Sequence, residues 1–281
     1  MKKINRVFVL LLVAAVFSIG GSAQDLLPDE IIAKHLDAIG TKDARAGVKT
    51  LFALGTSEFE SKIPIVKGGG RALVVSDPDN LFFIISLNSR EYPFEKIGYF
   101  NGKASLPYIA SGSRSLLGLF INEHIKILSD GLFGGTMSLR WALLDPELRK
   151  AKSKSAGIKK VDGKKLYAID YLVANMGSNE FTIRLFFDEK FNHVRSEYRR
   201  EVIRGQITFG SANQQANAKL ALTETFSDFR TVDGITLPYT YRVNFVSNSN
   251  SSINENEWGI NVEEYRLNQK LAPDFFTFDT K

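Results

Sequence analysis

Apolar and polar residues alternate along most of the second half of the chain, and this alternation constrains the fold more than any other feature. In the segment 181–187, every second residue would lie on one face of a strand: Phe181, Ile183, Leu185 and Phe187. The same alternation continues from Ile235 to Phe245 in a later segment. A period of two over successive segments is typical of antiparallel strands that bury one face. We therefore expect a meander-like antiparallel sheet with one apolar face.

The same pattern, with turn signals between the segments, predicts two blocks of strands. The first block covers residues 49–59, 70–77, 80–89 and 95–108, with the glycine-rich stretch 67–71 as a hairpin turn. The second block covers residues 164–174, 180–190, 192–203, 219–230, 234–246 and 256–269. A helix is predicted over residues 28–40, because apolar residues recur at helical spacing between Pro28 and a capping Gly40.

A helical insertion is expected between the two blocks, over about residues 113–150. Its predicted helices are 113–133 and 136–150. The first is apolar around most of its circumference, which leaves two interpretations open. It is either a helix packed inside the core, which its pattern alone favours, or a lid over an apolar cavity.

The stretch 226–242 predicts a β-hairpin. Asp233 and Gly234 provide the positive φ angles that a two-residue hairpin turn favours. Pro238 lacks a backbone donor, so we expect it at a sheet edge, at a bulge or beside a break in pairing.

The N-terminus has the pattern of an export signal. Lys2, Lys3 and Arg6 accompany an apolar run over residues 7–19, and Gly21-Ser22-Ala23 forms a small-residue cleavage site. We expect cleavage after Ala23 and a periplasmic protein, with secretion or a retained membrane anchor as alternatives. Residues 24–281 would form a single domain.

Composition limits the classes of partner that we expect for the exported chain. Removal of the signal lowers the formal net charge from +5 by three, to +2, so nucleic-acid binding gains no support. The chain has no cysteine, so its stability depends on the apolar core and not on disulfides.

The sequence offers little for catalysis. His35, His124 and His193 are widely spaced, so we expect surface or half-buried histidines and no bound metal or cofactor. Glu224 and Asp228 would project from one face of a strand as paired carboxylates, although exposed decoration is the commoner explanation. We expect no enzyme; a hydrolase that uses Glu224, Asp228 or His193 is the less favoured alternative.

Lysines concentrate in the segment that follows the insertion. They include Lys152, Lys154, Lys159 and Lys160. The segment is either a solvated connection or a contact to an anionic membrane surface or an acidic envelope protein.

Five segments, taken in order, resemble one known family. They are residues 30–40 (EIIAKHLDAIG), 97–108 (IGYFNGKASLPY), 161–171 (VDGKKLYAIDY), 182–199 (TIRLFFDEKFNHVRSEYR) and 226–242 (FSDFRTVDGITLPYTYR). This order is similar to that of the LolA/LolB-like superfamily of periplasmic lipoprotein carriers, in particular its divergent outer-membrane lipoprotein-sorting branch. The FDEKFN turn departs from the family pattern, because it lacks the usual Thr-Gly.

The resemblance implies a mainly β fold: a half-open antiparallel barrel of roughly eleven strands, with helices over an apolar cavity for acyl chains. It implies no cofactor and no covalent chemistry. We expect a monomeric carrier of a lipid or lipoprotein acyl chain, with an opening lid. The cavity and lid residues would be Leu116, Leu117, Phe120, Ile121, Trp141 and Leu144, with Arg71 as the choice for a cargo-orienting arginine.

A non-carrying envelope scaffold that binds a protein partner is the main alternative. In that case side chains would fill the interior of the barrel. The candidates are Phe82, Phe83, Phe94, Phe181, Phe186 and Phe187.

Overall fold

The structure is a computed structural model, and it describes residues 26–90, 92–107, 114–145, 152–173, 181–202, 218–249, 252–272 and 274–276. The expected export signal, residues 1–23, lies outside this part of the chain. Within it, twelve strands form one antiparallel sheet in the order β5-β4-β3-β2-β1-β12-β11-β10-β9-β8-β7-β6. The two edge strands, β5 and β6, do not pair with each other, so the sheet stays open, as predicted.

The strands follow the chain in two blocks, one on each side of the insertion. The first block is β1 (Leu51–Lys62), β2 (Ile65–Ser76), β3 (Leu81–Ser86), β4 (Phe94–Phe100) and β5 (Lys103–Ser105). The second block is β6 (Lys152–Val161), β7 (Lys164–Leu172), β8 (Phe181–Phe187), β9 (His193–Val202), β10 (Ala218–Val232), β11 (Ile235–Ser249) and β12 (Ser252–Leu267). The last strand returns to pair with β1 and joins the blocks.

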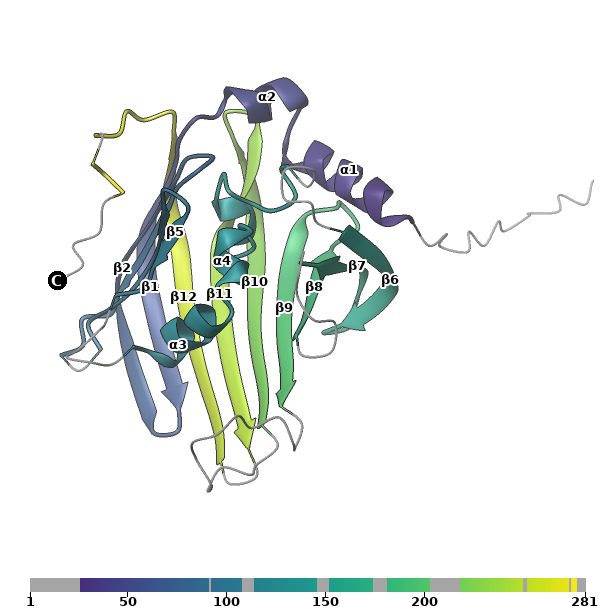
Figure 1. Cartoon of the computed structure of the whole chain (residues 1–281). Helices are drawn as coiled ribbons and strands as arrows, with labels where there is room; N and C mark the ends of the chain where they lie inside the picture. The colour runs from purple at the N-terminus through teal and green to yellow at the C-terminus, as the bar shows by residue number, and fades with distance from the viewer. Residues whose placement is uncertain are drawn as a thin grey trace, which may run out of the picture.

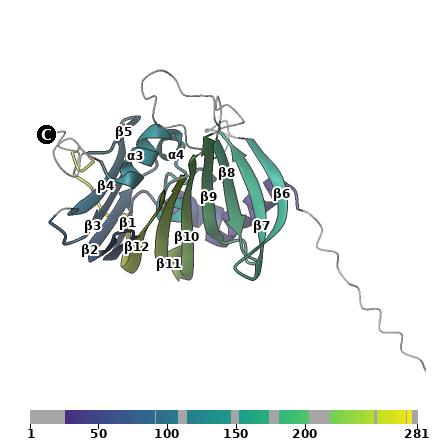
Figure 2. The same ribbon diagram turned by 90° about the horizontal axis from the view of Figure 1, so that it is seen from below.

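Short helices lie on one side of the curved sheet. Helix α1 (Pro28–Ile39) confirms the predicted N-terminal helix, and α2 (Lys42–Gly47) follows it. Helices α3 (Leu116–Glu123) and α4 (Lys126–Ser129) lie over the concave face, which Figure 2 shows from the end of the strands. In Figure 1, α1 lies beside the β6–β9 end of the sheet and α2 lies above the β10–β11 hairpin.

The insertion is less helical than predicted. The expected helix 113–133 is two short helices, and the described part of 136–150 contains only the 3-10 turn Gly135–Met137 followed by turns. Gly134 and Gly135 both have positive φ, which ends any continuous helix. The Ser138 hydroxyl then accepts a hydrogen bond from the Arg140 N–H, a local bond that competes with helix formation.

The insertion is part of the core. Leu117, Ile121, Ile127 and Leu128 are fully buried, and they belong to the same apolar cluster as the inner face of the sheet. The concave face is therefore filled with side chains in this conformation, as the interpretation of a core-packed helix requires. Of the phenylalanines expected to fill it, Phe83, Phe181 and Phe187 do so, Phe186 packs in a second, smaller cluster, and Phe82 and Phe94 are half-buried.

Two predicted loops are strands. The lysine-rich connection contains β6, which has no buried face and therefore shows no period-two pattern. The glycine stretch lies inside β2, while the turn falls at Ile63-Pro64. A Cβ at Gly70 would lie 2.6 Å from the Ser86 carbonyl oxygen, so glycine permits the last residue of β3 to lie close against β2.

The β10–β11 hairpin confirms the prediction made for it. Asp233 and Gly234 have φ angles of 48° and 80°, as a tight hairpin turn of two residues requires. The pairing of β11 with β12 ends at Thr240, so Pro238 lies beyond this break, where no ladder donor is needed. The Tyr265 hydroxyl donates to the Pro238 carbonyl across the gap, at 2.5 Å.

Replacement of Leu117 by Asp tests whether the insertion is part of the core. Leu117 is fully buried, so an unpaired carboxylate there should lower the free energy of unfolding by about 4 kcal/mol or more. Leu116 on the same helix is 43% exposed, and Leu116→Asp should change it by less than about 0.5 kcal/mol. Urea unfolding measures both values; equal, small losses would show that the insertion is not part of the core.

Candidate ligand pocket

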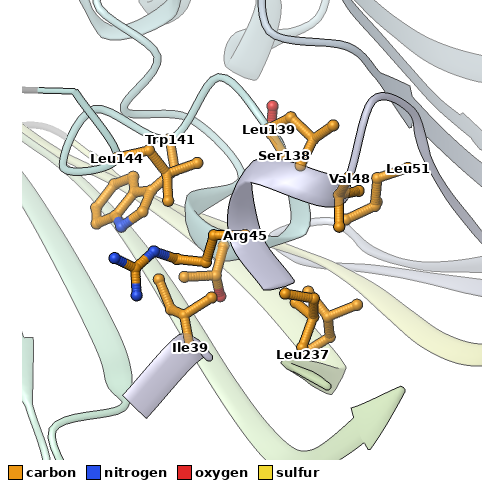
Figure 3. Close-up of a pocket in the computed structure, with 11 residues that line it drawn as sticks. Ile39, Arg45, Val48, Leu51, Ser138, Leu139, Trp141, Leu144 and Leu237 are labelled. Atoms are coloured by element: carbon orange, nitrogen blue, oxygen red, sulfur yellow. The ribbon is translucent and has the colours of Figure 1, made fainter. Parts of the chain in front are cut away.

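An apolar pocket opens between α1, α2, the β10–β11 hairpin and the segment after η1 (Gly135–Met137). Figure 3 shows the side chains that converge on it. Its volume is about 40 Å³, close to the share of one water molecule in the liquid, about 30 Å³. The lining residues are Ile39, Arg45, Val48, Leu51, Thr136, Ser138, Leu139, Trp141, Leu144, Ile235 and Leu237.

Close backbone contact places these elements around the pocket. A Cβ at Gly40 would lie 2.5 Å from the Gly234 carbonyl oxygen, so the α1–α2 junction rests directly on the turn of the hairpin. The side chains of Ile235 and Leu237 are buried below it. Glycine at position 40 thus allows the two helices to cover the end of the hairpin, which extends beyond its neighbouring strands.

Three polar residues, Arg45, Thr136 and Ser138, interrupt the apolar lining. The Arg45 guanidinium donates to the carbonyl oxygens of Leu36, at 2.5 Å, and Gly40, and so caps the end of α1. Among the described residues no carboxylate pairs with Arg45. The Thr136 hydroxyl is buried and has no hydrogen-bond partner in the described part of the chain, although buried hydroxyls normally have one. A ligand with a polar end would find a cation and a free hydroxyl here.

Trp141 connects the pocket to a buried pair of histidines. Its indole N–H donates to His35 Nε2 at 2.9 Å, so the His35 Nδ1 proton donates to the Phe191 carbonyl at 2.9 Å. The Trp141 ring stacks on His193 with centroids 4.4 Å apart. Burial lowers the pKa of His35 to about 4, and the pKa of His193 lies well below its usual value for the same reason.

Both histidines were expected at or near the surface, but both are fully buried, with ring centroids 6.2 Å apart. Sequence spacing gave no sign of this, since α1 and β9 meet only in the folded chain. The described residues contain no cluster of three or more His, Cys, Asp or Glu that could hold a metal ion.

Two buried carboxyl groups fasten the insertion to the sheet. Glu224 accepts hydrogen bonds from the Gly134 N–H at 2.7 Å and from the hydroxyls of Tyr198 and Tyr241 at 2.7 and 2.5 Å. Glu95 accepts from Tyr92 and from Ser115, the residue that caps α3. Burial raises the pKa of each carboxyl to about 7, although these hydrogen bonds favour the charged form.

The predicted pair Glu224 and Asp228 is not a pair in the structure. Glu224 is fully buried under the insertion, while Asp228 is exposed and pairs with Arg230 at 2.5 Å. Asp228 has a φ of 55°, although the register of β10 with β11 is the same on both sides of it, at Ser227–Thr240 and at Phe229–Pro238. The three groups of the hydrolase alternative therefore do not converge on one pocket.

The predicted cavity and lid residues fall in three places. Trp141 and Leu144 line the pocket, whereas Leu117, Phe120 and Ile121 lie in the core below α3. Leu116 points outward, and Arg71 lies on the exposed side of β2, where it pairs with Glu263 at 3.0 Å. Arg45 and Thr136 were not predicted, since each becomes distinctive only through its place beside the pocket.

No helix of the described residues is long and apolar enough to cross a membrane.

The buried acids and histidines predict how stability depends on pH. Each glutamate has a pKa of about 7 in the folded protein and an ordinary value of 4.5. Its contribution to the free energy of unfolding therefore falls as pH rises between these values, by about 1.4 kcal/mol per pH unit. The lowered histidine pKa values act oppositely, since their contribution falls as pH drops below 6.5.

We expect maximal stability near pH 6.5 and a decline up to about pH 7.5 that Glu224→Gln with Glu95→Gln removes. Glutamine at position 224 removes the titrating group without leaving the Tyr198 hydroxyl unpaired, because this hydroxyl can donate instead to the Leu132 carbonyl, 3.2 Å away. Thermal unfolding at a series of pH values measures the profile. An identical decline in the double variant would contradict the assignment to these two carboxyls.

The comparisons with known proteins give structural similarities alone. No protein-family model matches the chain, and no curated protein sequence is similar to it. A LolA superfamily protein from Nitrosomonas europaea matches 90% of this chain and 98% of its own, at 11% identity and a TM-score of 0.48. An outer membrane lipoprotein-sorting protein domain from Vibrio parahaemolyticus matches 88% and 96%, at 10% identity and a TM-score of 0.46.

A DUF1329 family protein from Desulfovibrio piger matches 89% of this chain and 96% of its own, at 11% identity and a TM-score of 0.46. The solved structures that match thus include one described with the superfamily name that the sequence resembles. Since these three TM-scores are below 0.5, the similarities carry no weight for the function, which is inferred from the open sheet, its filled concave face and the pocket.

Proposed function

We propose that the protein is an exported binding protein that shelters an acyl chain between the concave face of the sheet and the insertion. One observation carries this proposal: the pocket beside Trp141 is mostly apolar, opens at the surface and is bounded by buried core side chains and by a segment without regular structure. A ligand that entered there would contact apolar side chains along its whole length.

The pocket must widen to hold such a ligand, because about 40 Å³ is far below the 300 Å³ or more of common ligand sites. Three hydrogen bonds oppose this widening. They join Gly134 to Glu224, Leu139 to Ser76, and Trp141 to His35. At about 1 kcal/mol each they cost about 3 kcal/mol, which roughly four buried methylenes offset at about 0.8 kcal/mol each.

The polar end of the ligand would remain at the mouth of the pocket. Arg45 already occupies part of its wall and pairs with no described carboxylate, and Thr136 offers an unused hydroxyl. The proposal therefore replaces Arg71 by Arg45 as the residue nearest to a polar head. An anionic or ester head would suit both groups.

A non-carrying envelope scaffold is the second candidate. The observation that favours it is the continuous core formed by the insertion and the sheet, which leaves little space inside. Export to the periplasm, cleavage after Ala23 and the monomeric state are parts of the proposal in either case.

A pocket-filling substitution tests the carrier. Leu139 is half-buried in the lining, and Leu139→Trp should fill the pocket and weaken binding of a fluorescent dansyl fatty acid by about tenfold or more. Leu119→Trp is the control, since Leu119 is 45% exposed on α3 and does not line the pocket. Fluorescence titration of the exported protein measures both.

Lipid extraction and mass spectrometry of the purified protein complete this test. Absence of co-purified lipid, together with no saturable probe binding by the unaltered protein, would contradict the carrier and leave the scaffold. Equal losses in Leu139→Trp and Leu119→Trp would show that binding lies elsewhere.

The lysines of β6 define the second part of the proposal. Lys152, Lys154, Lys159 and Lys160 are exposed on an edge strand, where lysine also prevents edge-to-edge aggregation. We expect them to add attraction to an anionic membrane surface, at about 1 kcal/mol each.

Replacement of these four lysines by Gln should remove binding to phosphatidylglycerol vesicles in a sedimentation assay. Phosphatidylcholine vesicles provide the control for charge. Unchanged sedimentation of the variant would assign the lysines to edge protection only.

A further inference from the structure

Strands β9 and β10 separate at the point where β9 begins. The ladder between β9 and β10 ends at the pair Arg195–Thr225, whereas β10 continues to Val232. In Figure 1 the end of the β10–β11 hairpin extends past the start of β9 toward α2. Consecutive residues of a strand direct their backbone groups to opposite sides, so alternate residues from Phe226 to Val232 present N–H and C=O groups toward the side that β9 has left.

A cleft lies where the two strands have separated. It has two connected parts, of about 690 and 290 Å³, which share Lys164, Leu166, Asp188 and Phe229. One wall is the β10 segment Thr225–Phe229, and the other is the start of β7 with the turn between β8 and β9. This volume lies within the usual range of ligand sites and far exceeds that of the pocket beside Trp141.

The floor of the cleft is apolar. Leu166 is buried with Phe186 and Ala168 in the smaller apolar cluster, on the side of the sheet opposite to the insertion. Phe229 is half-buried at the other wall. A side chain that points down from an occupant of the cleft would therefore meet an apolar surface.

The rim carries unbalanced positive charge. Lys164, Lys165 and Lys190 are exposed and form no ion pair among the described residues, and Lys159 and Lys160 follow on the adjacent strand. The acidic groups of the lining are largely engaged. Asp188 accepts bonds from the N–H groups of Lys190 and Asn192 within its own turn, and Asp228 pairs with Arg230. Asp162 lies 4.0 Å from Arg195, so Glu189 is the one acidic residue of the lining without a side-chain ion pair or hydrogen bond among the described residues, against three such lysines.

We infer that this cleft is a second binding site, which takes an extended acidic segment of a partner protein as an added strand along β10. The open edge of β10 would supply backbone hydrogen bonds, the apolar floor would receive alternate side chains, and the lysines would pair with carboxylates on the others. A lipid head group would use the lysines but not the strand edge, so both features together favour a peptide. The site is separate from the acyl pocket and does not depend on it.

The probe is a fluorescein-labelled peptide in which glutamate alternates with valine or threonine, added to the exported protein and followed by anisotropy. Lys164→Glu with Lys165→Glu should weaken its binding by about tenfold or more, since two attractions become repulsions. Lys152→Glu with Lys154→Glu makes the same change of charge at the far end of β6 and should weaken it by less than about twofold. Melting curves check that both variants fold.

Backbone methylation distinguishes strand addition from attraction between charges. N-methylation of every second residue in one phase should abolish binding, while methylation in the other phase should leave it within about twofold, because only one set of N–H groups faces β10. Equal effects of the two phases would overturn strand addition. Absence of peptide binding, equal losses in the two lysine variants, or binding of phosphatidylglycerol vesicles alone at Lys164 and Lys165 would overturn the site.

Discussion

An open sheet exposes one broad apolar face, and no element of the sheet itself can cover it. Here the insertion covers it from the middle of the chain, with α1 at one end. Most of the remaining structure follows from this requirement. Fully buried side chains such as Leu117 and Ile121 provide the contact area, and Glu95 and Glu224 satisfy backbone and hydroxyl donors that the covering segment buries. The cost is two carboxyl groups whose charged forms are disfavoured near neutral pH.

The β10–β11 hairpin produces both candidate sites. It extends beyond its neighbours on each side, because β12 turns toward β1 after Asn261 and β9 starts only at His193. On the concave side, α1 and α2 cover the exposed end and leave the apolar pocket. Toward β9 nothing among the described residues pairs with the freed edge, and the cleft lies there. One deviation from regular pairing thus gives an apolar and a charged recess within a few residues of each other.

How well each structural feature could be predicted depends on how far apart in the sequence the residues that form it lie. Local patterns were sufficient for α1, for the hairpin turn at Asp233-Gly234 and for the strands with one buried face, since each depends on neighbouring residues. They failed for β6, whose two faces are both accessible, and for residues 136–145, where Gly134, Gly135 and the Ser138 hydroxyl prevent a helix. The polar residues Arg45 and Thr136 of the pocket escaped prediction for a different reason. They meet the hairpin only after the whole sheet has formed.

The question whether the concave face holds a ligand or only its own insertion is a question of competing contacts. An acyl chain would replace apolar contacts with apolar contacts, so burial changes little where the chain and the insertion exclude each other. The free-energy difference between the ligand-bound and the closed conformation then depends on a few hydrogen bonds of the insertion, among them those from Trp141 to His35 and from Gly134 to Glu224. A buried hydrogen bond is costly to leave unmade, whereas a ligand head that reached Thr136 would satisfy a hydroxyl that now has no partner among the described residues. Carrier and scaffold can therefore share this fold, and the balance at these few groups decides between them.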